Sequence, residues 1–159
     1  MEKMLKLMEE DATLTPAELA LMLSKEEGDI VKMIAELEES GVILGKRTII
    51  DWDKVQSDRL TALIEVKVMP QHDDGFDKIA ERICENPEIK SLYLMSGGFD
   101  FAVMIEGKTM KEIAFFVARK LATIDAVTAT ATHFILKIYK DKGVIYGAPK
   151  KDMRETVIL

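Results

Sequence analysis

SLYLMSGGFDFAVMI, residues 91–105, places Gly97 and Gly98 between two segments whose apolar residues are typical of β-strands. Paired glycines between such segments predict a two-residue hairpin turn, because glycine readily adopts the positive φ angles that this turn requires. The turn would fix the register of the strands, so the side chain of Asp100 should point away from the face that carries Phe99 and Phe101. The stretch therefore predicts a hairpin with a carboxylate at a fixed position.

This hairpin lies in the middle of a longer alternation of strands and helices. Residues 60–69 alternate as a strand does, and so do residues 127–139. Helical spacing predicts one helix before the hairpin, which Asn86 and Pro87 end, and a second helix after it. Their apolar stripes are Phe76, Ile79, Ala80 and Ile83, and Met110, Ile113, Ala114, Val117 and Leu121. The order βαββαβ predicts an α+β fold, a ferredoxin-like α/β sandwich.

The strand that follows the two glycines is apolar on both of its faces. One face carries Phe99, Phe101, Val103 and Ile105, and the other carries Ala102 and Met104. Two helices can cover only one face of such a sheet, so the second face needs another partner. We therefore expect the second face to be a self-association surface.

The N-terminal third has the pattern of short helices. Met4, Leu7 and Met8 mark the first helix. The second begins at the sequence TPAE, residues 15–18, where the threonine can cap the helix, the proline takes the first helical position and the glutamate can bond back to the cap. These signals predict two consecutive helices before residue 24.

A third helix follows after a very short turn. Ser24 and Glu27 repeat the capping-box spacing, and the apolar stripe Ile30, Met33, Ile34 and Leu37 ends at Ser40 and Gly41. VILGKRTIID, residues 42–51, then reads as an extended segment. This order predicts a winged helix-turn-helix, for which the alternative is a three-helix packing module.

The net charge changes near residue 59, where the predicted pattern of helices gives way to alternating strands and helices. Residues 1–58 contain 7 Lys and Arg against 14 Asp and Glu, a net of −7, whereas residues 59–159 contain 15 against 14, a net of +1. We therefore predict a helix-turn-helix domain over residues 1–50, a linker over 51–59, a ferredoxin-like domain over 60–145 and a tail over 146–159.

Several protein classes are disfavoured by composition. The single cysteine, Cys84, allows no internal disulfide, and the sequence has neither a signal peptide nor an apolar run of membrane-spanning length, so we expect a cytoplasmic protein without membrane contact. His72, Asp73 and Asp74 are too contiguous to favour a metal site. With no catalytic constellation and no phosphate-binding glycine loop, we expect neither an enzyme nor a cofactor.

Taken together, residues 3 to about 145 resemble the Lrp/AsnC family of transcription regulators. The resemblance rests on ELEESGVILG at the end of the third helix, the following IIDWDK, ATHFILKIYKDKGV on the last strand and, most specifically, the pattern of glycine, any residue, aromatic and aspartate that residues 97–100 match. It implies a C-terminal ligand-sensing RAM domain, double-stranded DNA and a small amino acid as partners, and a homodimer that assembles to an octamer.

The resemblance also implies where the effector binds. In this family the hairpin lines a cleft between subunits, so Asp100 would accept hydrogen bonds from the α-ammonium group while main-chain N–H groups of Ser96, Gly97 and Gly98 receive the α-carboxylate. Thr130 and Thr132 share one strand face and are further candidates. The alternatives are a solvated edge carboxylate at residue 100 and threonines that are simply good strand residues.

The predicted recognition helix is acidic, which is unfavourable for binding to operator DNA. Residues 24–40 carry two lysines against six acidic residues, a net of −4, so phosphate contacts would have to come from the few basic residues nearby. The predicted DNA-binding residues are Ser24, Lys25, Lys32, Lys46 and Arg47. The alternative functions are an oligomeric amino-acid sensor with little or no DNA binding and, far less favoured, an enzyme that uses Asp100.

Overall fold

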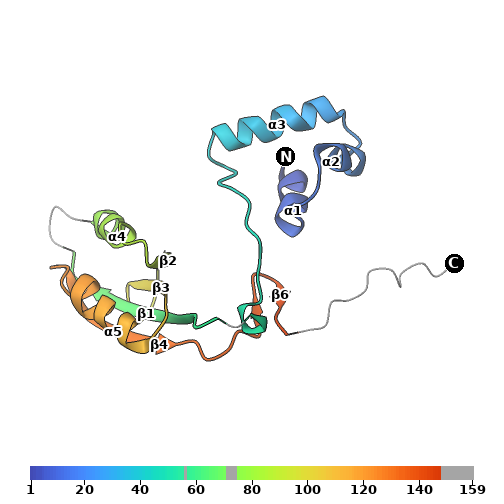
Figure 1. Cartoon of the computed structure of the whole chain (residues 1–159). Helices are drawn as coiled ribbons and strands as arrows, with labels where there is room; N and C mark the ends of the chain where they lie inside the picture. Colours follow the sequence, from blue (N-terminus) through green and yellow to red (C-terminus); the bar gives the residue numbers. More distant parts are fainter. Residues whose placement is uncertain (56, 71–74, 148–159) are drawn as a thin grey trace. The chain divides into compact units, whose positions relative to one another are not determined.

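The computed structural model describes residues 1–55, 57–70 and 75–147 (Figure 1). The chain divides into two compact units, Met1–Ile50 and a second unit that begins at Asp51. The first unit consists of α1 (Glu2–Glu10), α2 (Pro16–Leu23) and α3 (Glu27–Glu39). The second consists of a four-stranded sheet with two helices, followed by a short hairpin. Each unit is described below by itself.

Helix α2 begins as its sequence predicts. The Glu18 main-chain N–H donates to Thr15 Oγ1 at 3.3 Å, and the Thr15 N–H donates to the Glu18 carboxylate at 2.7 Å. Two of the N–H groups that a helix start leaves without partners are thereby satisfied. The predicted capping box of α2 is confirmed.

The predicted cap of α3 is wrong. Ser24 is the C-cap of α2 with a left-handed φ of 52°, and Glu26 occupies the N-cap of α3 without a side-chain hydrogen bond. The Lys25 N–H donates to the Ala20 carbonyl at 2.9 Å, which completes the end of α2. Because only three residues join the two helices, Ser24 belongs to the end of α2 and lies too early to cap α3.

The helical unit packs around one side of α3. Five buried residues form its core: Met4, Leu19, Ala20, Ile30 and Leu37. Gly41, with φ at +72°, ends α3 at the predicted place. Residues 42–50 are all described, and none of them forms a strand, so the segment predicted as a wing is extended chain without a β-hairpin (Figure 1).

The second unit has the predicted βαββαβ order. Its elements are β1 (Leu60–Val68), α4 (Phe76–Cys84), β2 (Ile89–Leu94), β3 (Phe101–Gly107), α5 (Met110–Phe116) and β4 (Val127–Phe134). The strands lie in the order β2-β3-β1-β4, and all neighbours are antiparallel. A 3₁₀ turn η1 (Trp52–Lys54) precedes the sheet, a π-helical turn η2 (Val117–Leu121) continues α5, and β5 (Lys140–Asp141) pairs with β6 (Val144–Ile145).

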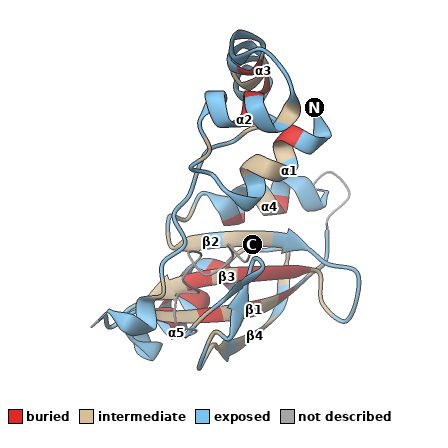
Figure 2. Cartoon of the chain, turned by 90° about the vertical axis from the view of Figure 1, so that its right-hand side faces the viewer, coloured by how far each residue is buried: buried red, intermediate tan, exposed pale blue. Residues whose placement is uncertain are grey.

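One face of the sheet forms the core of this unit. The register of β1 with β3 places Ile64 beside Val103 and Val66 beside Phe101, and all four side chains are buried. Ile79 and Ile83 of α4 and several residues of α5 and η2 belong to the same cluster. Figure 2 shows these buried positions along β1 and β3. Both helices therefore cover the same face of the sheet.

The other face carries a narrower apolar strip than the sequence predicts. Met104 lies opposite Leu63, and Ala102 lies opposite Glu65 in the register. Beside this strip the His133 Nε2 lies 3.3 Å from the Glu65 carboxylate. The face is thus a mixture of apolar and charged side chains, of which a second protein surface can bury the apolar centre.

Candidate functional site

The connection between β2 and β3 differs from the predicted two-residue turn. Strand β2 ends at Leu94 and β3 begins at Phe101, so six residues join them, and the Met95 N–H donates to the Asp100 carbonyl at 2.8 Å. Neither Gly97 nor Gly98 is among the described glycines with a positive φ. A longer loop bends without the special angles of a two-residue turn, so backbone geometry does not explain the two glycines.

Space inside the chain does not explain these glycines either. A Cβ added to Gly97 or Gly98 would meet no atom of the described residues within 4 Å. Both glycines and Ser96 are exposed, and so are the apolar side chains at the adjoining end of β2, Leu94 and Met95. Neither a positive φ nor close packing among the described residues therefore accounts for this glycine pair.

The half-buried Asp100 ends the ladder between β1 and β3. Its N–H donates to the Val66 carbonyl at 3.0 Å, and its carboxylate Oδ2 accepts the Val68 N–H at 2.8 Å. Val66 and Phe101 form the last pair of that ladder. The carboxylate therefore takes the place of a main-chain acceptor that residues preceding β3 would supply if the ladder continued toward Val68. The Asp100 carboxylate thus has a structural partner at the end of the strand in addition to its exposure to solvent.

The two threonine candidates lie on the other side of β1. Thr130 is paired with Val66 and Thr132 with Ile64, so both half-buried side chains share the face that the helices cover. Asp100, directly before β3, and Thr130 of β4 thus flank the same residue of β1, Val66. The structure brings the predicted effector residues to one end of the sheet.

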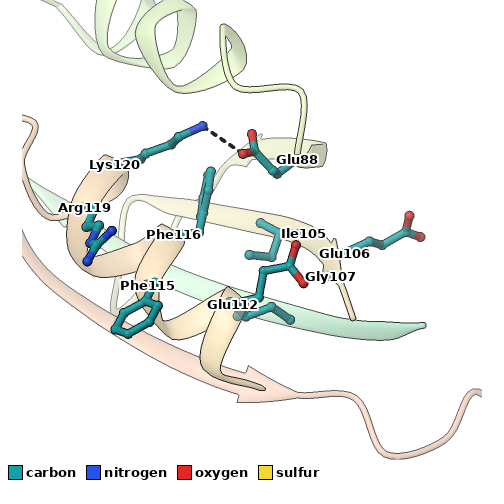
Figure 3. A pocket seen from close by; sticks show the side chains of 10 residues that line it. Glu88, Ile105, Glu106, Gly107, Glu112, Phe115, Phe116, Arg119 and Lys120 are labelled. Carbon is teal, nitrogen blue, oxygen red and sulfur yellow. Dashed lines mark hydrogen bonds and ion pairs between the residues drawn. The ribbon is translucent and has the colours of Figure 1, made fainter. Parts of the chain in front are cut away.

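A cavity of about 200 Å³ lies at the opposite end of β3, beneath α5 (Figure 3). Its floor is apolar, with Ile105, Ile113 and Phe116, and charged side chains form its rim. Space is tight at Gly107, where an added Cβ would lie 3.1 Å from Ile113 Cγ1. None of the predicted effector residues lines this cavity.

Several of the charged side chains around this cavity have partners within the chain. Lys120 Nζ lies 2.8 Å from the Glu88 carboxylate, Arg59 pairs with Glu106, and the Lys108 N–H donates to Glu112 at 2.8 Å. The Lys120 ammonium group lowers the pKa of Glu88. Ion pairs at two of the acidic rim residues, Glu88 and Glu106, favour a structural role for this part of the cavity. The sequence analysis did not detect the cavity, although Gly107 at the end of a strand was a possible signal.

The predicted DNA-binding residues are all exposed. Ser24 and Lys25 lie in the turn between α2 and α3, where they line a shallow hollow with Leu21 and Glu27. Lys32 lies on α3, and Lys46 and Arg47 lie in the extended segment after it. These side chains come from three places in the helical unit, and none is held by an ion pair among the described residues.

The described ranges 1–55, 57–70 and 75–147 lack two further kinds of site. These residues contain no cluster of three or more His, Cys, Asp or Glu side chains that could hold a metal ion. No described helix is long and apolar enough to cross a membrane. The unfavoured metal trio His72, Asp73 and Asp74 lies outside the described residues.

Comparison with known proteins identifies the family to which the chain belongs. Residues 61–145 match the model of the Lrp/AsnC ligand binding domain. The chain is 39% identical over 156 residues to the uncharacterized HTH-type transcriptional regulator YugG of Bacillus subtilis, a match that covers 98% of this chain and 94% of YugG. The chain therefore belongs to the Lrp/AsnC family. It is a transcriptional regulator with a helix-turn-helix unit and a ferredoxin-like RAM domain.

Solved structures agree with this fold. The transcriptional regulator NMB0573 of Neisseria meningitidis in complex with L-Met has a TM-score of 0.68 and 22% identity, covering 87% of this chain and 89% of its own. AsnC of Escherichia coli has a TM-score of 0.63 and 18% identity, covering 87% and 93%. The resemblance seen in the sequence is confirmed at the level of family and fold.

The Glu88–Lys120 pair leads to a pH-dependent prediction. A lowered carboxyl pKa in the folded state means that the pair stabilises the protein above the ordinary value of 4.5, and that this contribution is lost as the pH falls through the lowered value. Lys120→Met should therefore reduce the free energy of unfolding by about 0.5 kcal/mol at neutral pH, the range for partly exposed pairs.

The test is urea unfolding of the full chain at several pH values. The difference between Lys120→Met and wild type should shrink as the pH falls below 4.5, whereas a loss of apolar packing or of the contact with the Phe116 ring would persist at every pH. Lys108→Met, which removes an exposed lysine next to the lining residue Gly107, is the matched control. A difference that does not vary with pH would show that the pair contributes nothing.

Proposed function

We propose that this regulator binds operator DNA through α3 and that a small amino acid, bound at the β2–β3 loop between two copies of the chain, sets how the copies assemble. The DNA part rests on the short connection that presents α3 on the surface of the helical unit. The effector part rests on one observation, the exposed glycines Gly97 and Gly98 that their own chain does not require.

The chemistry of the loop suits a zwitterion. Main-chain N–H groups at Ser96, Gly97 and Gly98 would receive the α-carboxylate, because glycine lets a ligand approach the backbone closely. Asp100 would accept from the α-ammonium group; Val68 uses Oδ2, and a carboxylate has capacity for further donors. The L-Met complex of the Neisseria protein supports an amino acid as the ligand class.

A second copy of the chain would complete this site. The predicted effector residues line neither of the cavities described above, and the loop is flanked by exposed apolar side chains that include Tyr93, Leu94 and Met95. The open sheet face with Met104 at its centre would form the dimer, and contacts at the loop would join dimers, up to an octamer. Thr130 and Thr132 remain candidates at the edge of the same site.

The mechanism is a shift between assemblies. An amino acid that contacts two copies favours the arrangement in which both are correctly placed, and it can shift the equilibrium only by its difference in affinity between arrangements. Each arrangement would set a different spacing of the α3 helices on DNA. The second candidate function, an amino-acid sensor with little DNA binding, is favoured only by the acidic α3.

The first prediction of this proposal concerns phosphate contacts. If Lys46 and Arg47 neutralise phosphates, the double substitution to alanine should weaken binding to all duplexes alike. The slope of log K against log salt should become shallower by about two units per binding unit. Lys108→Ala with Lys140→Ala removes the same charge from exposed positions of the second unit and is the control. An unchanged slope would place the phosphate contacts elsewhere.

The second prediction concerns the effector. A thermal-shift screen of the free amino acids with the full chain should give at least one ligand, whose affinity is then measured by calorimetry. Asp100→Asn keeps an oxygen that can accept the Val68 N–H, so the fold should remain. Loss of the charge should make the binding free energy of the ligand less favourable by roughly 1.5–3 kcal/mol. Asp125→Asn, at an exposed position, is the control, and equal affinities would remove Asp100 from the site.

The third prediction concerns assembly. Met104→Glu would place an unpaired carboxylate at the centre of the open sheet face, so the dimer should weaken by about 3 kcal/mol or more. Sedimentation velocity over a range of concentrations measures this change. Val55→Glu introduces the same charge at an exposed apolar residue outside the sheet and should leave the dimer intact. A Met104→Glu dimer as stable as wild type would exclude this face as the interface.

A further inference from the structure

The charge of α3 conflicts with its position as a recognition helix. Residues 27–39 carry Lys32 against five acidic residues, a net of −4, and DNA is a dense array of phosphates. A helix that read bases through this average charge would be repelled. The distribution of side chains around the helix therefore matters more than their sum.

Burial fixes which side of α3 faces outward. Ile30 and Leu37 are buried in the core of the helical unit, and Met33 and Ile34 pack beside them. With 3.6 residues per turn, the opposite side of the helix is a strip of exposed residues. This outer strip consists of Gly28, Val31, Lys32, Ala35, Glu36 and Glu39.

Most of the acidic side chains lie outside this strip. At 100° per residue, Glu27, Asp29 and Glu38 fall on the two flanks of the helix, between the buried side and the outer strip. Glu36 and Glu39 belong to the strip but lie in the last turn of α3, roughly 12 Å and 16 Å from Gly28 at 1.5 Å per residue. Along residues 27–35, the first nine of α3, the outer strip therefore carries a single charge, that of Lys32.

The remaining side chains can read only one feature of a base pair. A recognition helix contacts base edges with its N-terminal part, where Gly28 leaves open space for close approach to the groove. Val31 and Ala35 offer methyl groups and no hydrogen bonds. In the major groove the apolar feature is the C5-methyl group of thymine. The strip thus matches methyl groups better than patterns of donors and acceptors.

We propose that α3 recognises its operator mainly through thymine methyl groups, which Val31 and Ala35 contact, while Lys32 supplies the cation of the strip for a guanine edge or a phosphate. This proposal rests on the DNA binding proposed above and specifies the kind of sequence that is read. It also explains how α3 could bind DNA although its flanks are acidic, because neither flank would face the floor of the groove.

The experiment begins by selecting duplexes from a random pool with the full-length chain. Each thymine of the selected site is then replaced singly by deoxyuridine, which removes the methyl group and keeps the base pairing. Replacement at a contacted position should weaken binding about fourfold, the effect of uncovering one buried methyl-sized group. Replacements at other positions should change affinity less than twofold.

Val31→Ala identifies the protein side of the contact. The variant should lose its sensitivity to deoxyuridine at one position of each half-site and keep it at the others, as a double-mutant cycle requires. Alanine is a better helix former than valine, so the helix should not be weakened. Val55→Ala is the matched control, because Val55 is 48% exposed and Val31 is 49% exposed.

The outcomes separate this inference from the function on which it rests. If no duplex is enriched, DNA binding itself fails, and the outer strip of α3 is then a surface for another protein. If duplexes are enriched but deoxyuridine has no effect at any position, α3 does not read methyl groups, although DNA binding stands. Equal sensitivity of Val31→Ala and wild type at every position would likewise overturn the proposed contact.

Discussion

The packing of α4 and α5 against a single face of the sheet is the constraint on which the second unit depends. Because Ile64, Val66, Phe101 and Val103 all point to that face, alternation along the strands directs their neighbours to the open one. In the same register β1 extends beyond the first residue of β3, and there the Asp100 carboxylate accepts the Val68 N–H of β1. One choice of buried face therefore fixes both the surface available to another copy and the end of the sheet where the predicted effector residues gather.

Asp100 links the proposed ligand to the backbone of the sheet. Its carboxylate accepts the Val68 N–H at the point where β1 shifts its register against β4, between Lys67 and Val68. A ligand that bonded to the same carboxylate would compete with, or tighten, the contact that ends the ladder. Effector binding at this position would thus act directly on the geometry of β1, the strand that follows the segment from the helical unit.

Signals that depend on local chemistry were predictable, and those that depend on loop length were not. The capping box of α2 involves four consecutive residues, and the apolar stripes of α3, α4 and α5 follow from helical spacing, so sequence alone was sufficient. The angles of Gly97 and Gly98 depend on where β2 and β3 end, and the role of Ser24 depends on the three-residue turn. The hydrogen bond from Val68 joins residues 32 apart in sequence, which no local pattern reveals.

The small core of the helical unit has a consequence for the order in which the protein loses its activities on heating. Five buried residues hold about fifty residues together there, whereas the sheet unit buries more than twice as many. Small domains bury a smaller fraction of their surface and are correspondingly marginal. The part of the chain that reads DNA should therefore open first, and a warmed regulator would still sense its effector and assemble after it had ceased to recognise an operator.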